Sequence, residues 1–192
     1  MNYLAHTLLA EPTPQGYAGS LLGDFWHGAP DVAWPAALAH GVLLHRHIDS
    51  ATDRHPAFVA VRSELPPALR RYAGIVLDVA FDFVLTRQWP QHAGVSLREH
   101  VDAVNAALVE VAGAPYTPPD FADFARRAVE VDLLARYGEV ATMQRAFGSL
   151  SRRLARANPV AGAWDSLQPL LPLLEEALPP LLADLRRVRV DA

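Results

Sequence analysis

The stretch PALRRYAGIVLDVAFDFVLTRQW, residues 67–89, carries the longest helical pattern in the chain and sets the fold class. Apolar residues recur at three- and four-residue steps, at Leu69, Tyr72, Ala73, Val76, Val79, Ala80 and Phe83. This spacing predicts an amphipathic helix that packs on a core. Pro66 and Pro67 open the predicted helix, and Pro90 is expected to end it.

The same periodicity, broken by sixteen prolines, predicts helices on both sides of this stretch. Before it, the expected helices cover residues 3–10, 16–26, 34–52 and 57–63. After it, we expect a helix capped by Ser96 and running to about Val111, one beginning at 118–120, and two more over 137–156 and 161–188. Strand alternation is scarce, so residues 1–192 are predicted to form a single compact all-α domain. The Leu-rich last helix is expected to cover the core in preference to pairing with another subunit.

Composition excludes several classes of protein. The 192 residues include no cysteine, so disulfides, a thiolate nucleophile and a zinc-thiolate site are excluded, which fits a cytoplasmic protein. The first residues lack the basic start of a signal peptide, and no apolar run reaches the roughly 18 residues that span a bilayer. A net charge of -4 argues against generic nucleic-acid binding. Every basic residue is arginine, which composition bias explains most simply.

Two acidic residues interrupt the central helix. Asp78 and Asp82 are four residues apart in GIVLDVAFDFVL, and therefore lie on one helical face. Burying carboxylates is costly unless they are paired, hydrogen-bonded or bound to a metal. A metal site and ion pairs to Arg70, Arg71 or Arg87 both remain open interpretations.

A second group of polar residues lies in HRHIDSATDRHP, residues 45–56. His45 and Asp49 share a helical face, and Asp53 follows four residues later. Asp24 in SLLGDFWHG and His6 in MNYLAH are further candidates. Carboxylates and imidazoles without thiolate suit Mn²⁺, Mg²⁺ or Fe better than structural zinc.

Each of these residues also has a structural interpretation. His6 alone is more often a hydrogen-bonded core or helix-end histidine than a ligand, and Asp24 is more often a buried cap or an arginine partner. Asp53 and His55 are placed to cap a helix end before Pro56. The remaining histidines, which are expected to have surface or packing roles, are His27, His40, His47, His92 and His100.

Four blocks together resemble the acyl carrier protein phosphodiesterase family, also called acyl carrier protein hydrolases. They are MNYLAH, SLLGDFWHG, GVLLHRHIDSATDRHP and RRYAGIVLDVAFDFVLTRQW, and they span residues 1–89. The resemblance implies an all-α fold of the HD-phosphohydrolase type. It also implies Mn²⁺-dependent hydrolysis of the phosphodiester of holo-acyl carrier protein, giving the apo carrier and free 4′-phosphopantetheine.

The resemblance also implies roles for individual residues. The metal ligands would be Asp24, His45, Asp49, Asp78 and Asp82, with His6 as a further ligand. The chemistry of the reaction, apart from the resemblance, suggests Asp49, Asp53 or His55 as the base that activates water, and Arg46 or Arg71 as the group that binds the phosphate oxygens. Two departures stand out. The His–Asp dipeptide of HD proteins is absent, and Trp26 and His27 replace a smaller residue and an arginine of the family pattern.

The implied partner is an acidic protein, whereas this chain is itself negative. Recognition would then need a local arginine patch, with Arg70–Arg71 and Arg126–Arg127 as candidates, and binding would weaken with salt. Three other functions stay open: hydrolysis of a nucleotide or another small phosphate ester, non-catalytic binding of a carrier protein, and a purely structural role. The oligomeric state is not predicted.

Overall fold

Helices and loops account for the whole of the described structure, a computed structural model in which residues 1–190 are described. The first half contains α1 (Tyr3–Leu9), α2 (Pro14–Leu22), α3 (Ala36–Arg54), α4 (Pro56–Glu64), α5 (Pro67–Arg70) and α6 (Ala73–His92). The second half contains α7 (Leu97–Ala112), α8 (Pro119–Glu130), α9 (Val140–Arg153), α10 (Ala163–Leu167) and α11 (Leu171–Leu185). Short 3₁₀ turns cover Leu134–Arg136, Val160–Gly162 and Gln168–Leu170. The predicted all-α class is confirmed.

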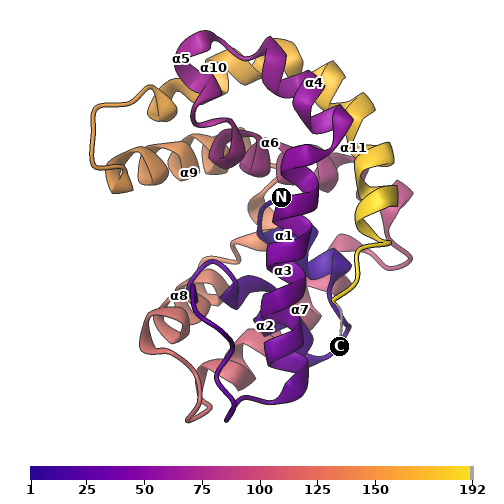
Figure 1. Cartoon of the computed structure of the whole chain (residues 1–192), viewed down its shortest axis with the longest axis vertical. Coiled ribbons are helices and arrows are strands. Elements are labelled where there is room, and N and C mark those ends of the chain that lie inside the picture. Colours follow the sequence, from indigo (N-terminus) through magenta and orange to yellow (C-terminus); the bar gives the residue numbers. More distant parts are fainter. Residues whose placement is uncertain (191–192) are drawn as a thin grey trace.

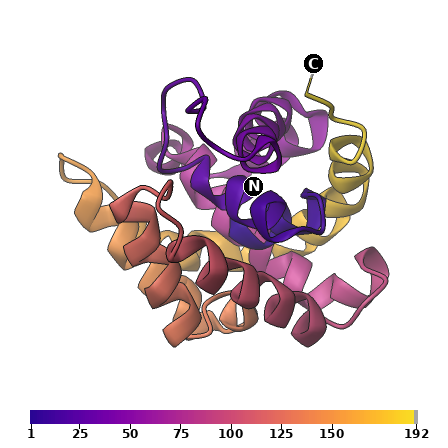
Figure 2. The ribbon, with the colours of Figure 1, turned by 90° about the horizontal axis from the view of Figure 1, so that it is seen from below.

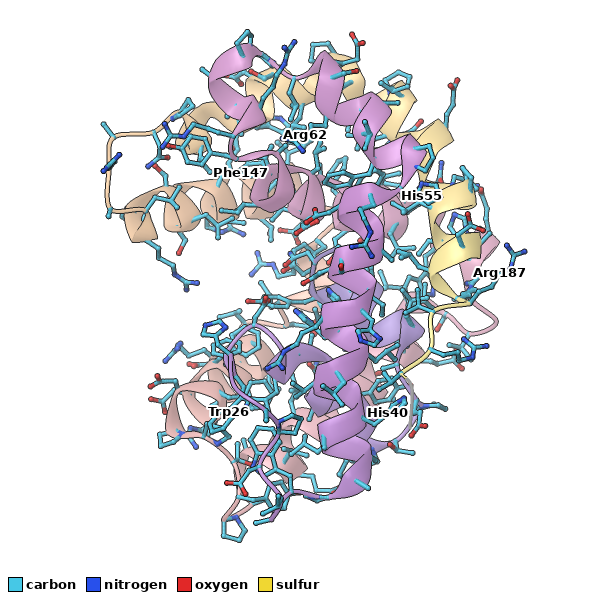
Figure 3. All side chains as sticks on the ribbon, viewed as in Figure 1. Trp26, His40, His55, Arg62, Phe147 and Arg187 are labelled. Atoms are coloured by element: carbon cyan, nitrogen blue, oxygen red, sulfur yellow. The ribbon has the colours of Figure 1, made fainter. Side chains whose placement is uncertain are left out.

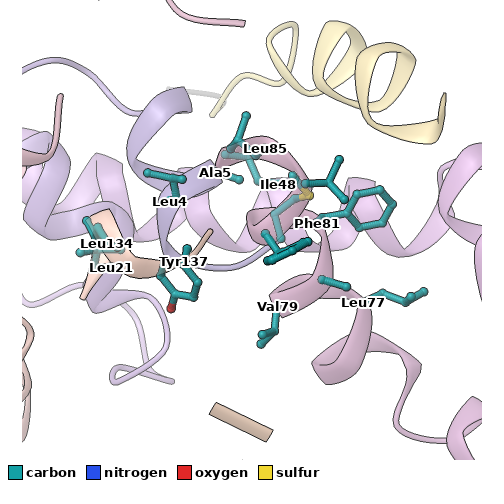
Figure 4. Packing of buried hydrophobic residues seen from close by; sticks show 14 of the residues in the cluster. Leu4, Ala5, Leu21, Ile48, Leu77, Val79, Phe81, Leu85, Leu134 and Tyr137 are labelled. Atoms are coloured by element: carbon teal, nitrogen blue, oxygen red, sulfur yellow. The ribbon is translucent and has the colours of Figure 1, made fainter. Parts of the chain in front are cut away.

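Helix α6 forms the centre of the apolar core that residues 1–190 build. Leu77, Phe81 and Leu85 are fully buried on it, and α1 and α11 pack against the same helix (Figure 4). A helix that is apolar almost all round is a buried helix, because no face of it is suited to water. The buried leucines of α11 complete this core, as predicted for the last helix.

The long α3 spans the molecule and carries the residues of the 45–56 block (Figure 1). Helix α2 lies between α3 and α7, as the view from below shows (Figure 2). Helices α2 and α3 touch at Gly19 and Gly41: a Cβ on Gly19 would lie 2.4 Å from the carbonyl oxygen of Leu38. This close approach brings the end of α2 against the middle of α3.

Several predicted helix boundaries were wrong. The helix predicted over 66–89 is two helices, because Arg71 and Tyr72 form a turn in which Tyr72 has φ −108° and ψ 11°. Pro90 does not end α6 but lies in its last turn. Only Gln91 and His92 follow it in the helix. The helix predicted over 161–188 is broken by a 3₁₀ turn that contains Pro169. Within residues 1–190, no helix is long and apolar enough to cross a membrane.

Candidate active site

His45 lies at the centre of a cluster of polar side chains that also contains His6, Asp24 and Asp49. Its ring is 3% exposed, and its Nδ1 lies 2.7 Å from the carbonyl oxygen of Ser20 at the end of α2. A carbonyl oxygen only accepts, so Nδ1 carries the proton and donates it. The other nitrogen, Nε2, then faces carboxylate oxygens of Asp49 at 3.1 Å and Asp24 at 3.4 Å. A neutral His45 would direct a lone pair at two anions, so this position requires a cation, either a proton or a metal ion.

His6 approaches the same carboxylate from α1. Its Nε2 lies 3.0 Å from Asp49 Oδ1, and its ring stacks on that of His45 with centroids 3.9 Å apart. Since a carboxylate only accepts, His6 donates through Nε2. Its Nδ1 is buried and, among residues 1–190, has no hydrogen-bond partner. Asp49 is therefore held between two imidazoles.

The cluster fits a divalent ion. One ligand atom from each of His6, His45 and Asp49 lies within 4.8 Å of the others. His45 shows the arrangement that is usual for a metal ligand, because its second nitrogen is held by a backbone carbonyl. His6 lacks such an acceptor for Nδ1, so its contact with Asp49 better suits a residue that orients the carboxylate. His45, Asp49 and Asp24 are the best-placed ligands, with His6 beside them.

Burial and neighbouring charges shift the pKa values of the residues in this cluster. Burial lowers the pKa of His45, but hydrogen bonds to Asp24 and Asp49 outweigh it and raise the pKa to about 9. Burial would raise the pKa of Asp49, but the contacts with His45 and His6 outweigh it and lower the pKa. Burial and the neighbouring charge of His45 lower the pKa of His6 to about 4. Without a metal, the extra proton of the cluster therefore resides on His45.

Asp78 extends the acidic cluster towards the amino group of Met1. This buried amino group donates to Asp78 Oδ1 at 2.7 Å and lies 3.5 Å from Asp49 Oδ1. Asp78 is 28% exposed, so it is open to solvent on one side. The ion pairs considered for it with Arg70, Arg71 or Arg87 are not formed. The structure places Met1 at Asp78 and pairs Arg87 with Glu175.

Asp82 points to the backbone of α1. Its two oxygens accept the N–H groups of Leu4 at 2.7 Å and Ala5 at 3.1 Å. These N–H groups belong to the first turn of α1, where helical partners are lacking. Burial raises the pKa of Asp82 to about 7, although both backbone contacts act to lower it. This arrangement assigns Asp82 a structural task, which is to fix α1 and with it His6.

The other predicted residues lie at the margins. Asp53 is exposed, and its charge is the last of the causes that raise the pKa of Asp78, after burial and Asp49. His55 caps α4 by accepting from the N–H of Ala57, and its Nε2 lies 3.3 Å from Asp184. This arrangement matches the capping interpretation of His55.

Neither predicted phosphate-binding arginine reaches freely into the cluster. Arg46 donates to the carbonyl oxygens of Trp26 and Gly28. It thereby ties α3 to the loop that follows Asp24. Arg71 lies over the ring of Tyr72, with the guanidinium carbon 4.7 Å from the ring centroid. Both side chains have other partners in this conformation.

Two positions that sequence reasoning missed also shape the site. The Ser20 carbonyl sets the tautomer of His45, and Gly23 makes room for the ring. A Cβ on Gly23 would lie 2.3 Å from His45 Cγ. The glycine in SLLGDFWHG was a visible signal, but the neighbour that requires it lies 22 positions along the chain. Figure 3 shows the resulting group of oxygen and nitrogen atoms beside the middle of α3, between the labelled His40 and His55.

A helical domain that holds two imidazoles and several carboxylates without thiolate has the ligand set of metal-dependent hydrolases. Comparison with known protein families identifies the kind of hydrolase. The family model for acyl carrier protein phosphodiesterase matches residues 1–185, so the chain belongs to that family of phosphodiester hydrolases.

Curated relatives agree with this assignment. Two proteins named acyl carrier protein phosphodiesterase, from Enterobacter sp. (strain 638) and Klebsiella pneumoniae (strain 342), are each 32% identical over 87% of this chain and 86% of their own. A third with that name, from Salmonella agona (strain SL483), is 30% identical over 92% of this chain and 91% of its own. No solved structure matches the chain.

Proposed function

We propose that this protein is a metal-dependent phosphodiesterase of the cytoplasm that acts on holo-acyl carrier protein. It would cleave the diester that joins 4′-phosphopantetheine to a serine, giving the apo carrier and free 4′-phosphopantetheine. The names of the relatives support the substrate. One observation supports the metal: His45 Nε2 faces Asp49 and Asp24 at 3.1 and 3.4 Å, a position that calls for a cation.

Mn²⁺ is the expected ion, and Mg²⁺ or Fe would suit the same oxygen and nitrogen donors. When bound, such an ion lowers the pKa of water and offsets the charge of phosphoryl oxygens. His45, Asp49 and Asp24 would hold it. His6 would orient Asp49 through the 3.0 Å contact, and Asp82 would fix His6 by holding the first turn of α1.

The exposed carboxylates supply the acid–base chemistry. A phosphodiester is cleaved when water attacks phosphorus and the serine oxygen leaves, so the attacking water must give up a proton. Asp53 is exposed and lies four residues after Asp49 on α3, so both carboxylates are on the same face of that helix. Asp53 is therefore our candidate for the base. Its solvent exposure lets it exchange the proton with water afterwards.

Mass spectrometry of the carrier tests this function. Purified holo-acyl carrier protein is incubated with the protein and Mn²⁺, and the mass of the carrier is followed with time. We expect the carrier to lose the mass of 4′-phosphopantetheine. Asp49→Asn should slow the loss by more than the roughly 10- to 100-fold seen when an outer-shell partner is removed.

The controls separate the competing functions. Asp102→Asn changes an exposed carboxylate of α7 and should leave the rate unchanged. Cleavage of small phosphodiesters or nucleotides with an intact holo carrier would favour a small-molecule hydrolase. Tight binding of holo carrier without any mass loss would favour a binding module.

A further inference from the structure

A groove between α8 and α9 opens next to the carboxylate cluster. Its volume is about 570 Å³. Half-buried apolar residues line it, including Phe124 on α8 and Leu150 on α9, and Val79 of α6 belongs to its wall. Figure 1 shows α8 and α9 on the same side of the molecule, with α6 and α1 nearer its centre.

One end of the groove is lined by residues next to Met1, whose amino group contacts the cluster. Asn2 and Tyr3 line the groove, and the neighbouring Met1 amino group contacts Asp78 and Asp49. Burial raises the pKa of the Tyr3 phenol. The charge of Asp24 in the cluster raises it further, and the charge of Arg153 in the groove lowers it. A molecule in the groove would therefore contact the N-terminal residues that adjoin the proposed reaction centre.

The rim of the groove is strongly basic. Four arginines and a single acidic residue belong to its lining: Arg127, Arg136, Arg145, Arg153 and Glu130. Helix α9 contains three arginines and no acidic residue, in a chain whose net charge is -4. This concentration of positive charge on a negative protein would attract an acidic partner.

Two of these arginines are open to a partner. Arg136 pairs with Glu139 at 3.2 Å, and Arg145 lies 4.0 Å from the same carboxylate. Arg127 and Arg153 are exposed and, over residues 1–190, form no ion pair. The two therefore present guanidinium groups on opposite walls of the groove.

The two patches suggested by the sequence are less suited to this task. Arg70 donates to the carbonyl oxygens of Leu65 and Ser63, and Arg71 lies over the ring of Tyr72. Arg126 pairs with Asp123 on its own helix. Of the suggested arginines, only Arg127 belongs to the lining of the groove.

We propose that this groove is the surface on which an acidic face of the carrier protein docks, guided by Arg127 and Arg153. The inference rests on the proposed function, because it takes the carrier as the partner. The prosthetic arm alone offers one phosphate, which belongs at the carboxylate cluster, and it would leave the arginines of both walls without an anion. An acidic protein surface supplies several carboxylates at once and would hold its modified serine beside Asp24 and Asp49.

Binding of the apo carrier tests this surface apart from catalysis. The apo carrier lacks the arm and cannot be hydrolysed, so its affinity reports docking of the protein surface alone. We expect Arg127→Glu combined with Arg153→Glu to weaken apo-carrier binding about tenfold or more at low salt. Binding to the wild type should also weaken as salt rises, and the double variant should lose most of that dependence.

A matched control and a milder variant complete the experiment. Arg62→Glu makes one such charge reversal at an exposed position on α4 that does not line the groove, and should bind as the wild type does. Arg127→Gln with Arg153→Gln should give a smaller loss, which guards against misfolding of the reversed-charge variant. Circular dichroism confirms the fold of each.

The outcomes are distinguishable. Equal apo-carrier binding by the wild type, the Arg127/Arg153 variants and Arg62→Glu would overturn the docking surface. A loss of holo-carrier binding without a change in apo-carrier binding would also overturn it, and would place the arm in the groove instead. Failure of the proposed function appears differently, as an unchanged holo carrier in the mass-spectrometric assay of the wild type.

Discussion

His45 and Ser20 are joined by a 2.7 Å hydrogen bond from the imidazole Nδ1 to the backbone carbonyl oxygen. This bond fixes the ring orientation and leaves Nε2 to face Asp24 and Asp49. The packing of α2 on α3 therefore determines which nitrogen can bind an ion. It links a feature of the fold, the close contact at Gly19 and Gly41, to the chemistry of the cluster.

Replacing His45 should abolish metal binding while the fold remains. His45→Gln retains a polar side chain but removes the imidazole nitrogen that faces the two carboxylates. We expect Mn²⁺ affinity and the rate of carrier hydrolysis to fall by at least about a hundredfold. Calorimetric titration with Mn²⁺ and the mass-spectrometric assay measure the two effects. His47→Gln, two positions along the same helix on its exposed side, is the control. Unchanged Mn²⁺ affinity in His45→Gln would remove this histidine from the ligand set.

The metal-free protein should lose stability as the pH rises from about 6.5 to 9. The pKa of His45 is about 9 in the folded protein and 6.5 in its ordinary state, so protonation stabilises the fold. This stabilisation is complete below the unfolded pKa and is lost as the pH passes the folded one. Its size is on the order of 3 kcal/mol.

Urea unfolding in the presence of EDTA measures this loss. The pKa of the Met1 amino group is also raised, because the charges of Asp78 and Asp49 outweigh the effect of burial, so this group adds a pH dependence of its own. The prediction is therefore the difference between the wild type and His45→Gln, which retains that amino group. Identical pH profiles for the two proteins would contradict it. Mn²⁺ should bind with release of a proton near pH 7, since the ion and the proton compete for Nε2.

Gly23→Ala should displace the His45 ring. The added Cβ would lie 2.3 Å from Cγ and 2.4 Å from Cδ2 of the ring, well inside van der Waals contact. We expect a loss of about 1–3 kcal/mol in the free energy of unfolding and a drop in Mn²⁺ affinity. Gly74→Ala is the matched control, because nothing would lie within 4 Å of the Cβ that this substitution adds. In α6 that alanine should stabilise the protein by roughly 0.5–1 kcal/mol. Equal Mn²⁺ affinity in both variants would show that the ring adjusts freely.

The fold was predictable to the extent that local signals determine it. Proline positions and apolar periodicity located most helices, and Ser96 with Glu99 forms the capping box that begins α7. Pro90 misled the prediction because a proline in the last turn removes only one hydrogen bond and leaves that turn intact. The turn at Arg71 and Tyr72 has no glycine or proline to mark it, so periodicity alone ran through it.

The sequence predicted several of the residues that gather at the site, but it did not predict the partner of each one. The four-residue spacing placed His45 on the same face as Asp49, and the structure confirms their contact at 3.1 Å. The same spacing could not distinguish Asp78 from Asp82, because their partners lie 77 or 78 positions away, at Met1 for Asp78 and at Leu4 and Ala5 for Asp82. Contacts of that range depend on how the helices pack, and no local pattern encodes them.

Asp82→Asn should weaken the site through the backbone of α1. The carboxylate accepts two N–H groups, whereas an asparagine offers one oxygen and would turn its own N–H₂ group towards the other donor. One buried N–H in the first turn of α1 then lacks a partner, which costs about 1–3 kcal/mol. Since His6 directly follows Ala5 in this helix, its 3.0 Å contact with Asp49 should loosen as well.

Hydrogen exchange distinguishes this role from metal ligation. If Asp82 acts by holding α1, the amides of Leu4 and Ala5 should exchange faster in Asp82→Asn, both with and without Mn²⁺. Mn²⁺ affinity should fall only modestly, by less than in His45→Gln. Asp102→Asn, which removes an exposed partner of Arg98, should change stability by less than about 1 kcal/mol and leave both amides protected. A complete loss of Mn²⁺ binding with unaltered exchange at Leu4 and Ala5 would instead make Asp82 a ligand, as the sequence pattern implied.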